Sequence, residues 1–157
     1  MRSIRHAAFP ADLDEVRTLF LEYQADIGVD LCFQGFADEL ATLPGSYDPP
    51  AGRLLLAVDD RLVVGCVALR PLQGTDCEMK RLYVRPGARG SGLGRLLTIS
   101  VLNEARTAGY GRVLLDTLPS MGKAIDMYRS LGFLEVAPYR PNPIAGALYL
   151  ALELQPS

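Results

Sequence analysis

The stretch from Arg85 to Arg95, which reads RPGARGSGLGR, has the residue types of an anion-binding turn. It lies between a predicted strand and a predicted helix, and a helix N-terminus presents unpaired N–H groups and a partial positive charge. Glycines let a phosphate approach the backbone closely, and Arg89 and Arg95 add positive charge. We expect a phosphate or pyrophosphate ligand here. The alternative is a tight connection that binds nothing.

The two common nucleotide motifs do not fit this turn. The dinucleotide pattern GxGxxG fails because Arg95 stands where a third glycine must follow Gly90 and Gly92. The Gly-Lys-Ser/Thr of a P-loop is absent from the stretch as well. The surrounding elements must therefore identify the ligand.

The cysteines and the histidine offer little other chemistry. Cys32, Cys66 and Cys77 are odd in number and lack a CxxC spacing, so we expect reduced, mostly buried thiols and neither a disulfide framework nor a metal site. His6 is the single histidine and lies where a first strand is predicted. A Ser-His-Asp or Cys-His mechanism would depend on this one poorly placed residue. We interpret it as a strand or surface histidine.

Composition predicts one water-soluble domain over residues 1–157. The chain has 157 residues, 49% of them hydrophobic, and a formal net charge of −2 without blocks of like charge. This balance argues against nucleic-acid binding, which needs a basic face. The longest apolar run, residues 62–69, is far shorter than the ~18 residues of a membrane span, so we expect no membrane partner. No secretion signal is visible at the N-terminus, so we expect a cytoplasmic location.

Hydrophobic periodicity predicts the elements that position the glycine-rich turn. The predicted helices are 13–27, 33–43, 93–105 and 123–131, and the predicted strands are 53–58, 62–69, 77–84, 112–117, 133–139 and 147–154. Simple alternation along strand 77–84 predicts two faces. One face carries Glu78, Lys80, Leu82 and Val84, and the other carries Cys77, Met79, Arg81 and Tyr83.

Three segments in order resemble the GNAT N-acetyltransferases. Residues 89–94, RGSGLG, are similar to the family's acetyl-CoA signature, and residues 78–84 to its fourth strand. Residues 124–133 are similar to its helix with a closing Leu-Gly-Phe. The resemblance implies an α/β fold with a mixed, largely antiparallel sheet flanked by helices. One departure is Met121, which stands where many members have an Asn.

The resemblance implies acetyl-CoA as co-substrate and assigns its contacts. Backbone groups of Leu82, Tyr83 and Val84 would bind the pantetheine arm, and an N–H among them would stabilise the oxyanion. The pyrophosphate would lie on Arg89, Gly90, Ser91, Gly92, Leu93, Gly94 and Arg95.

Two side chains are expected to move protons in this scheme. An amine like that of lysine has a pKa of ~10.4, so a base must take its proton, and Glu78 is expected to do so through water. Alternatively, Glu78 is a strand carboxylate paired with Lys80 or Arg81. Tyr128 matches the family's general acid for the departing thiolate. Alternatively, it belongs to the buried stripe of an ordinary helix.

The acceptor is the least defined part of the expected site. Tyr23, Phe33, Arg81 and Tyr139 would flank it, and Arg81 or Arg140 could meet a carboxylate on a small amine or amino acid. In the alternative, the aromatic residues are core and the arginines are solvated. A protein amine as acceptor, a catalytically silent acyl-CoA-binding or regulatory domain, and a structural domain without a CoA site are the rival functions. The resemblance also makes a homodimer plausible.

Overall fold

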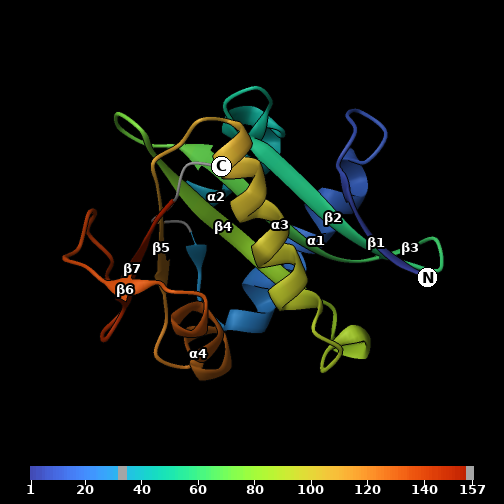
Figure 1. Ribbon diagram of the computed structural model, residues 1–157. Helices are drawn as coiled ribbons and strands as arrows, with labels where there is room; N and C mark the ends of the chain where they lie inside the picture. The colour runs from blue at the N-terminus through green and yellow to red at the C-terminus, as the bar shows by residue number, and fades with distance from the viewer. Residues whose placement is uncertain (32–34, 155–157) are drawn as a thin grey trace.

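The computed structural model describes residues 1–31 and 35–154 (Figure 1). The described residues form a seven-stranded sheet in the order β1-β2-β3-β4-β5-β7-β6, in which only β4 and β5 run parallel. The strands are β1 Arg2–His6, β2 Arg53–Asp59, β3 Leu62–Pro71, β4 Asp76–Val84, β5 Arg112–Thr117, β6 Leu134–Glu135 and β7 Leu148–Glu153. The helices are α1 Leu13–Ile27, α2 Phe36–Ala41, α3 Leu93–Thr107 and α4 Gly122–Ser130. The predicted mixed, largely antiparallel sheet with flanking helices is confirmed.

Helices cover both faces of this sheet and bury two hydrophobic clusters. On one face, α3 and α4 pack through residues such as Leu97 and Tyr128. On the other face, α1 and α2 pack through residues such as Phe20 and Phe36. Figure 1 shows α3 crossing the near face of the sheet with α1 behind it. The apolar stripes read from the sequence therefore become the two interfaces of a three-layer domain.

Most predicted elements match the observed ones to within a few residues, and one prediction is wrong. The strand expected over 133–139 is only two residues long, because β6 ends at Glu135. Pro138 lacks the N–H group that a strand donates to its neighbour, which favours the loop that follows. This loop, residues 136–147, folds back toward β4 and carries Tyr139 and Arg140.

The predicted alternation along β4 is wrong beyond Lys80. The register pairs Ala68 of β3 with Lys80 but Cys66 with Tyr83, so β4 holds one extra residue. Arg81 takes up that residue in a bulge, with a φ of 61°. As a result Leu82 packs on the α3 side, whereas Tyr83 joins the cluster beneath α1. The bulge therefore exchanges the two faces of the strand halfway along it.

The same region separates β4 from β5. In the described residues, the parallel ladder joins only Asp76, Cys77 and Glu78 to residues 112–114. Beyond this point the segment Leu82 to Val84 has no ladder partner on the β5 side within the described chain. Its backbone groups on that side face a gap between two strands. Such an edge can bind an extended ligand through backbone hydrogen bonds.

Arg81 holds the bulge against α2 through a bidentate pair with Glu39. Its Nε and Nη2 atoms donate to the two Glu39 carboxylate oxygens at 2.9 Å each. The guanidinium also stacks near the rings of Tyr23 and Phe36, at 5.7 and 5.2 Å from their centroids. The Arg81 side chain is 2% exposed, so this charge is compensated inside the protein.

Removing this buried carboxylate should destabilise the fold strongly. We expect Glu39→Ala to lower the free energy of unfolding by about 3–5 kcal/mol, because it removes the carboxylate that balances a buried guanidinium. Urea denaturation measures the change. The matched control is Glu135→Ala, whose pair with Arg129 is long and exposed and should change stability by less than about 0.5 kcal/mol. Equal losses in both variants would contradict the prediction.

Candidate active site

A cleft of about 900 Å³ runs between the glycine-rich turn, β4 and α4. Leu82, Tyr83 and Val84 line one wall, as expected for the segment of β4 that has left β5. The lining also includes these residues of the turn: Arg89, Gly90, Gly92, Leu93, Gly94 and Arg95. The structure thus brings the two predicted cofactor-binding segments together along one surface.

The turn has the backbone of an anion-binding loop. Gly90 and Gly92 have φ values of 81° and 82°, a conformation that residues with a Cβ rarely adopt. Gly92 is the N-cap of α3, and no side chain caps the first turn of that helix. Open space surrounds the Cα of Gly92, so a ligand can approach the N–H groups that follow.

The two arginines of the turn fix it to its neighbours and remain at the surface. Arg89 donates from Nε to the carbonyl of Val84 at 2.8 Å and forms a 3.1 Å ion pair with Asp26 of α1. Arg95 donates to the Ser130 hydroxyl of α4 at 2.8 Å. Both arginines lie along the cleft, where they can add positive charge beside a phosphate. The Ser91 hydroxyl instead donates to the carbonyl of Ala88 and stabilises the turn.

A smaller cavity of about 40 Å³ continues the cleft inward, between the diverging strands β4 and β5. The residues that line both spaces are Tyr23, Ile27, Leu82 and Met121. Beyond them the cavity is bordered by Tyr128 of α4, Lys80 of β4 and Asp116 of β5. A long ligand in the cleft would therefore place its inner end beside these three side chains.

Tyr128 occupies the position expected of a proton donor at this inner end. It is 4% exposed, its ring packs 5.6 Å from that of Phe133, and it lines the cavity. Burial raises the pKa of the Tyr128 hydroxyl well above its ordinary value. The hydroxyl therefore keeps its proton at neutral and moderately alkaline pH and can give it to a basic leaving group.

Met121, the expected departure from the family pattern, leaves the start of α4 closed. Its backbone N–H donates to the carbonyl of Leu118, and its own carbonyl accepts from Ile125. Its sulfur accepts a weak hydrogen bond from the Thr117 hydroxyl at 3.7 Å. The helix start is therefore held by backbone bonds, and the Met121 side chain contributes apolar lining to the cleft and the cavity.

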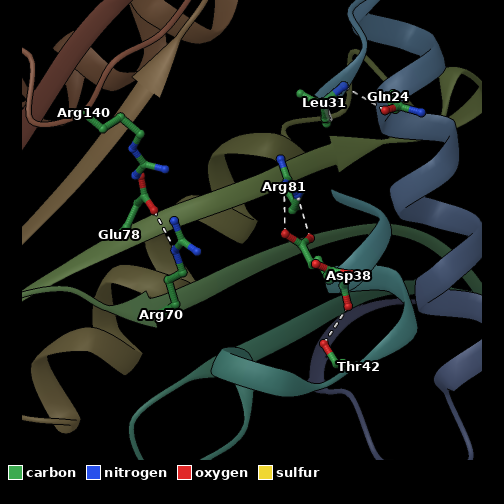
Figure 2. A network of polar contacts seen from close by, with 9 residues as sticks. Gln24, Leu31, Asp38, Thr42, Arg70, Glu78, Arg81 and Arg140 are labelled. Carbon is green, nitrogen blue, oxygen red and sulfur yellow. Dashed lines mark hydrogen bonds and ion pairs between the residues drawn. The ribbon is translucent and has the colours of Figure 1, made fainter. Parts of the chain in front are cut away.

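Glu78 is fully buried beneath the loop that connects β6 and β7 (Figure 2). Its Oε1 accepts a hydrogen bond from Nε of Arg70 at 2.8 Å, and its Oε2 accepts one from the Tyr139 hydroxyl at 2.6 Å. The Arg140 guanidinium also contacts Oε2. These partners differ from Lys80 and Arg81, the neighbours that sequence alone suggested. Glu78 is not among the described residues that line the inner cavity.

The remaining residues predicted for the acceptor have mixed positions. Tyr23 and Arg81 line the inner cavity, whereas Tyr139 reaches Glu78 from the loop. Phe33 lies outside the described residues, as does Cys32.

Cys66 and Cys77 are free and buried, and burial raises the pKa of each thiol to about 12, so they stay neutral. His6 is an exposed residue of β1.

Sequence reasoning missed Lys80 and Asp116 as members of the site. The parallel register pairs Glu78 with Leu114, so Lys80 and Asp116 follow at the same level two residues further along each strand. Asp116 accepts a hydrogen bond from the Asn142 side chain at 3.3 Å. Burial, reinforced by the charge of Arg81, lowers the pKa of Lys80 to about 7. Lys80 lies two residues after Glu78 on the same strand, and this spacing is the sequence signal that could have identified it.

The lowered pKa of Lys80 predicts a specific pH dependence of stability. Between pH 7 and 10.5 the unfolded chain holds the Lys80 proton and the folded chain loses it, so stability rises with pH. We expect the stability of the wild type relative to Lys80→Met to increase by about 1 kcal/mol from pH 7 to pH 8. Urea denaturation at both pH values measures it, and other titrating groups cancel in the difference. Parallel curves for the two proteins would contradict the assignment.

The comparisons with known proteins identify the family of the chain. The model of the Acetyltransferase (GNAT) family matches residues 13–133. An uncharacterised N-acetyltransferase of Schizosaccharomyces pombe is 43% identical over 97% of this chain and 94% of its own length. An uncharacterised N-acetyltransferase of Escherichia coli is 30% identical over 85% of this chain and 80% of its own length.

Solved structures show the same fold. A GNAT acetyltransferase from Staphylococcus aureus has a TM-score of 0.82 at 20% identity and covers 99% of this chain and all of its own. An acetyltransferase from Salmonella typhimurium, solved with its cofactor acetyl-CoA, has a TM-score of 0.70 at 22% identity, with 100% and 96% covered. In the described residues, no helix is long and apolar enough to cross a membrane. This chain belongs to the GNAT acetyltransferase family and is an acetyl-CoA-dependent N-acetyltransferase.

Proposed function

We propose that the protein transfers an acetyl group directly to a primary amine of a small molecule or an amino acid. The small cavity at the inner end of the cleft carries this proposal. Its volume of about 40 Å³, between β4, β5, α1, α4 and the loop after β6, is well below the roughly 300–1,000 Å³ of a pocket for a larger ligand, so it suits the amine end of a small acceptor better than the surface of a folded protein. Tyr128 borders the same cavity, so acceptor and proton donor would meet there.

The cofactor contacts follow from the two walls of the cleft. Backbone groups of Leu82, Tyr83 and Val84 would bind the pantetheine arm, because this edge of β4 has no partner in β5. The pyrophosphate would accept hydrogen bonds from the N–H groups of residues 90–95. When bound, acetyl-CoA supplies an activated thioester carbonyl. A backbone N–H of the β4 edge would stabilise the negative charge that develops on its oxygen.

Proton transfer would use Glu78 and Tyr128 on either side of the reacting atoms. The acceptor amine must lose a proton before its nitrogen bonds to the carbonyl carbon. Glu78 would take this proton through water, since it lies outside the cavity lining. As the carbon–sulfur bond breaks, the Tyr128 hydroxyl would protonate the sulfur, so CoA leaves as a thiol. Both side chains then exchange protons with solvent.

The acceptor would be bordered by Tyr23, with Arg81 and Tyr139 in supporting positions. Tyr23 lines both the cleft and the cavity. Arg81 already binds Glu39, so it would act through the bulge that it holds in place. Tyr139 would orient the Glu78 carboxylate through its 2.6 Å hydrogen bond.

The experiment that tests this function is a steady-state screen of acceptors. Purified protein and acetyl-CoA are mixed with small primary amines, amino acids and a peptide with a free N-terminus, and released CoA thiol is measured. The proposal expects acetylation of small amines. Acetylation of the peptide alone would favour a protein acceptor, and acetyl-CoA binding without any transfer would favour a silent acyl-CoA-binding domain.

A homodimer stays a prediction from the family resemblance. Sedimentation analysis of the purified protein would check it.

The role of Glu78 is tested by Glu78→Gln. We expect kcat to fall by about 10²-fold or more at a pH of about 8, because the amide cannot accept the proton. Glu153→Gln, on the exposed end of β7, is the matched control and should leave kcat unchanged. An unchanged kcat in Glu78→Gln would assign this carboxylate to holding the loop through Arg70, Tyr139 and Arg140 instead.

A further inference from the structure

We propose that Tyr23 is a further catalytic residue, whose hydroxyl donates a hydrogen bond to the oxygen of the reacting thioester carbonyl. The proposal rests on the proposed position of acetyl-CoA and goes beyond the proton transfers assigned to Glu78 and Tyr128. It gives the developing oxyanion a side-chain donor in addition to a backbone N–H of the β4 edge. Tyr23 lies in α1, on the opposite face of the sheet from Tyr128.

The place of Tyr23 at the junction of the cleft and the inner cavity carries the argument. Among the described residues, those that line both spaces are Tyr23, Ile27, Leu82 and Met121. Of these four side chains, the Tyr23 side chain is the one that ends in a hydrogen-bond donor. The thioester would lie at this junction, because the pantetheine arm would follow the cleft and the sulfur would reach Tyr128 in the cavity. Tyr23 therefore borders the proposed place of the reacting carbonyl.

The gap between β4 and β5 allows tyrosines from opposite faces of the sheet to line one cavity. Tyr128 belongs to the cluster beneath α3 and α4, whereas Tyr23 packs against the cluster beneath α1 and α2. Both side chains line the inner cavity. Burial is the main cause of the raised pKa of Tyr128, and the Tyr23 hydroxyl adds to it, which places the two hydroxyls near each other. A thioester between them can receive a hydrogen bond on its oxygen from Tyr23 and a proton on its sulfur from Tyr128.

The surroundings of the Tyr23 hydroxyl keep it protonated and able to donate. Burial raises the pKa of this hydroxyl above its ordinary value. Arg81 acts in the opposite direction, through its charge and as a hydrogen-bond donor to the hydroxyl, and Asp116 partly offsets that charge. The Arg81 guanidinium carbon lies 5.7 Å from the centroid of the Tyr23 ring. Because a guanidinium only donates hydrogen bonds, its contact uses the hydroxyl oxygen and leaves the hydroxyl proton for a carbonyl oxygen.

Ion pairs on both sides of Tyr23 fix α1 against the wall that would bind the cofactor. Glu22 pairs with Arg85, just after β4, at 3.0 Å. Asp26 pairs with Arg89 of the glycine-rich turn at 3.1 Å. The position of Tyr23 relative to the β4 edge is therefore set before acetyl-CoA binds. A donor that is already in place stabilises an oxyanion without a cost of reorganisation during the reaction.

The small size of the inner cavity increases the need for a second donor. Its volume of about 40 Å³ leaves room for a group of a few atoms, so an acetyl group there would have little contact with water. When the amine nitrogen bonds to the carbonyl carbon, an electron pair moves onto the carbonyl oxygen, and it returns as the carbon–sulfur bond breaks. Negative charge away from water is costly unless donors surround it. Tyr23 would donate to this oxygen and keep its own proton throughout.

Tyr23→Phe tests the proposal by steady-state kinetics, because it removes the hydroxyl and keeps the ring. We expect kcat to fall by about 10²-fold, the usual effect of losing one oxyanion donor. The KM for the amine and the Kd for acetyl-CoA should change little, since the ring still lines both spaces. The matched control is Tyr110→Phe, whose lost hydroxyl binds the Ala51 carbonyl away from the cleft, and it should keep the wild-type kcat. A raised KM for the amine with an unchanged kcat would make Tyr23 an acceptor-binding residue and overturn the proposal.

Infrared spectroscopy of bound acetyl-CoA tests the hydrogen bond without turnover. Difference spectra between complexes of acetyl-CoA with and without ¹³C at its thioester carbonyl isolate the band of that carbonyl. A hydrogen bond lowers the stretching frequency of a carbonyl, so the band should move to higher frequency in Tyr23→Phe than in the wild type. Tyr128→Phe should leave the band in place, because the Tyr128 hydroxyl is assigned to the sulfur.

The outcomes separate this proposal from the proposed function. A thioester band that stays in place in Tyr23→Phe would overturn the oxyanion contact, even if kcat falls, while amine acetylation by the wild type stands. A band that moves, together with a lower kcat, would support the contact. Failure of the wild type to acetylate any small amine would reject the proposed acceptor, and the band of bound acetyl-CoA would then still decide the role of Tyr23.

Discussion

Replacement of Tyr128 by Phe is expected to lower kcat for acetyl transfer by about 10²–10⁴-fold, the usual contribution of a positioned general acid. The change removes only the hydroxyl, and the ring can keep its contact with Phe133 in the buried interface of α4. Without a donor, the sulfur must leave as a thiolate in a site where charge is poorly solvated. The expected loss therefore falls on kcat, and the Kd for acetyl-CoA should change little.

The control for Tyr128→Phe is Tyr110→Phe. The Tyr110 hydroxyl donates to the carbonyl of Ala51 at 2.5 Å, away from the cleft, so its removal should leave kcat unchanged. Because burial raises the pKa of Tyr128, its proton should not limit kcat on the alkaline side between pH 7 and about 10. A Tyr128→Phe enzyme with wild-type kcat would reject the general-acid role and leave Tyr128 as a packing residue of α4.

Replacement of Gly92 by Val is expected to weaken acetyl-CoA binding by at least about tenfold. The φ of Gly92 is 82°, and an L-residue in this region costs roughly 1–2 kcal/mol. A Cβ added at Gly92 would meet no protein atom within 4 Å. The valine side chain would instead occupy the place in front of the first N–H groups of α3, where the pyrophosphate is proposed to bind. Calorimetric titration measures the Kd.

Gly87→Val is the matched control for this prediction. Gly87 also has open space around its Cα, but its φ is not positive and it does not line the cleft in the described residues. The control should bind acetyl-CoA like the wild type. Equal binding by both variants would mean that the turn is a connection without a role in pyrophosphate binding. Equal losses in both would point to a general effect on the loop.

Local patterns in the sequence predicted the elements and the cofactor side of the site. Helical periodicity located α1 and α3, and short apolar runs rich in β-branched residues located β2 and β3, because both signals arise within a few residues along the chain. The glycine-rich turn was recognised for the same reason. Its glycines at positive φ, and its place between β4 and α3, are local properties that the residue types report directly.

The parts that were not predicted depend on contacts between distant residues. The bulge at Arg81 shifts the pairing of β4 with β3 by one residue. It is held in place by Glu39, which lies 42 positions away in the chain. Simple alternation along the strand cannot predict this bulge, so Leu82 and Tyr83 were each predicted on the wrong face of β4. The partners of Glu78 come from β3 and from the loop after β6. No spacing within residues 78–84 indicates them.

The charged residues on the acceptor side of the site were not predicted for the same reason. Lys80 and Asp116 come together because β4 and β5 are parallel neighbours that diverge, an arrangement set by the whole sheet. The lowered pKa of Lys80 follows from burial and from the arginine beside it, both of which exist only in the folded chain. A sequence motif can therefore predict the cofactor of this enzyme more readily than the chemistry of its acceptor.

The most direct test of the site is a crystal structure of the protein with bound acetyl-CoA. We expect the pyrophosphate on the N–H groups of residues 90–95, the pantetheine arm along Leu82 to Val84, and the thioester sulfur within hydrogen-bond reach of the Tyr128 hydroxyl. The acetyl group should enter the cavity beside Lys80 and Asp116. A cofactor bound elsewhere, or a thioester directed away from Tyr128, would contradict this account of the active site.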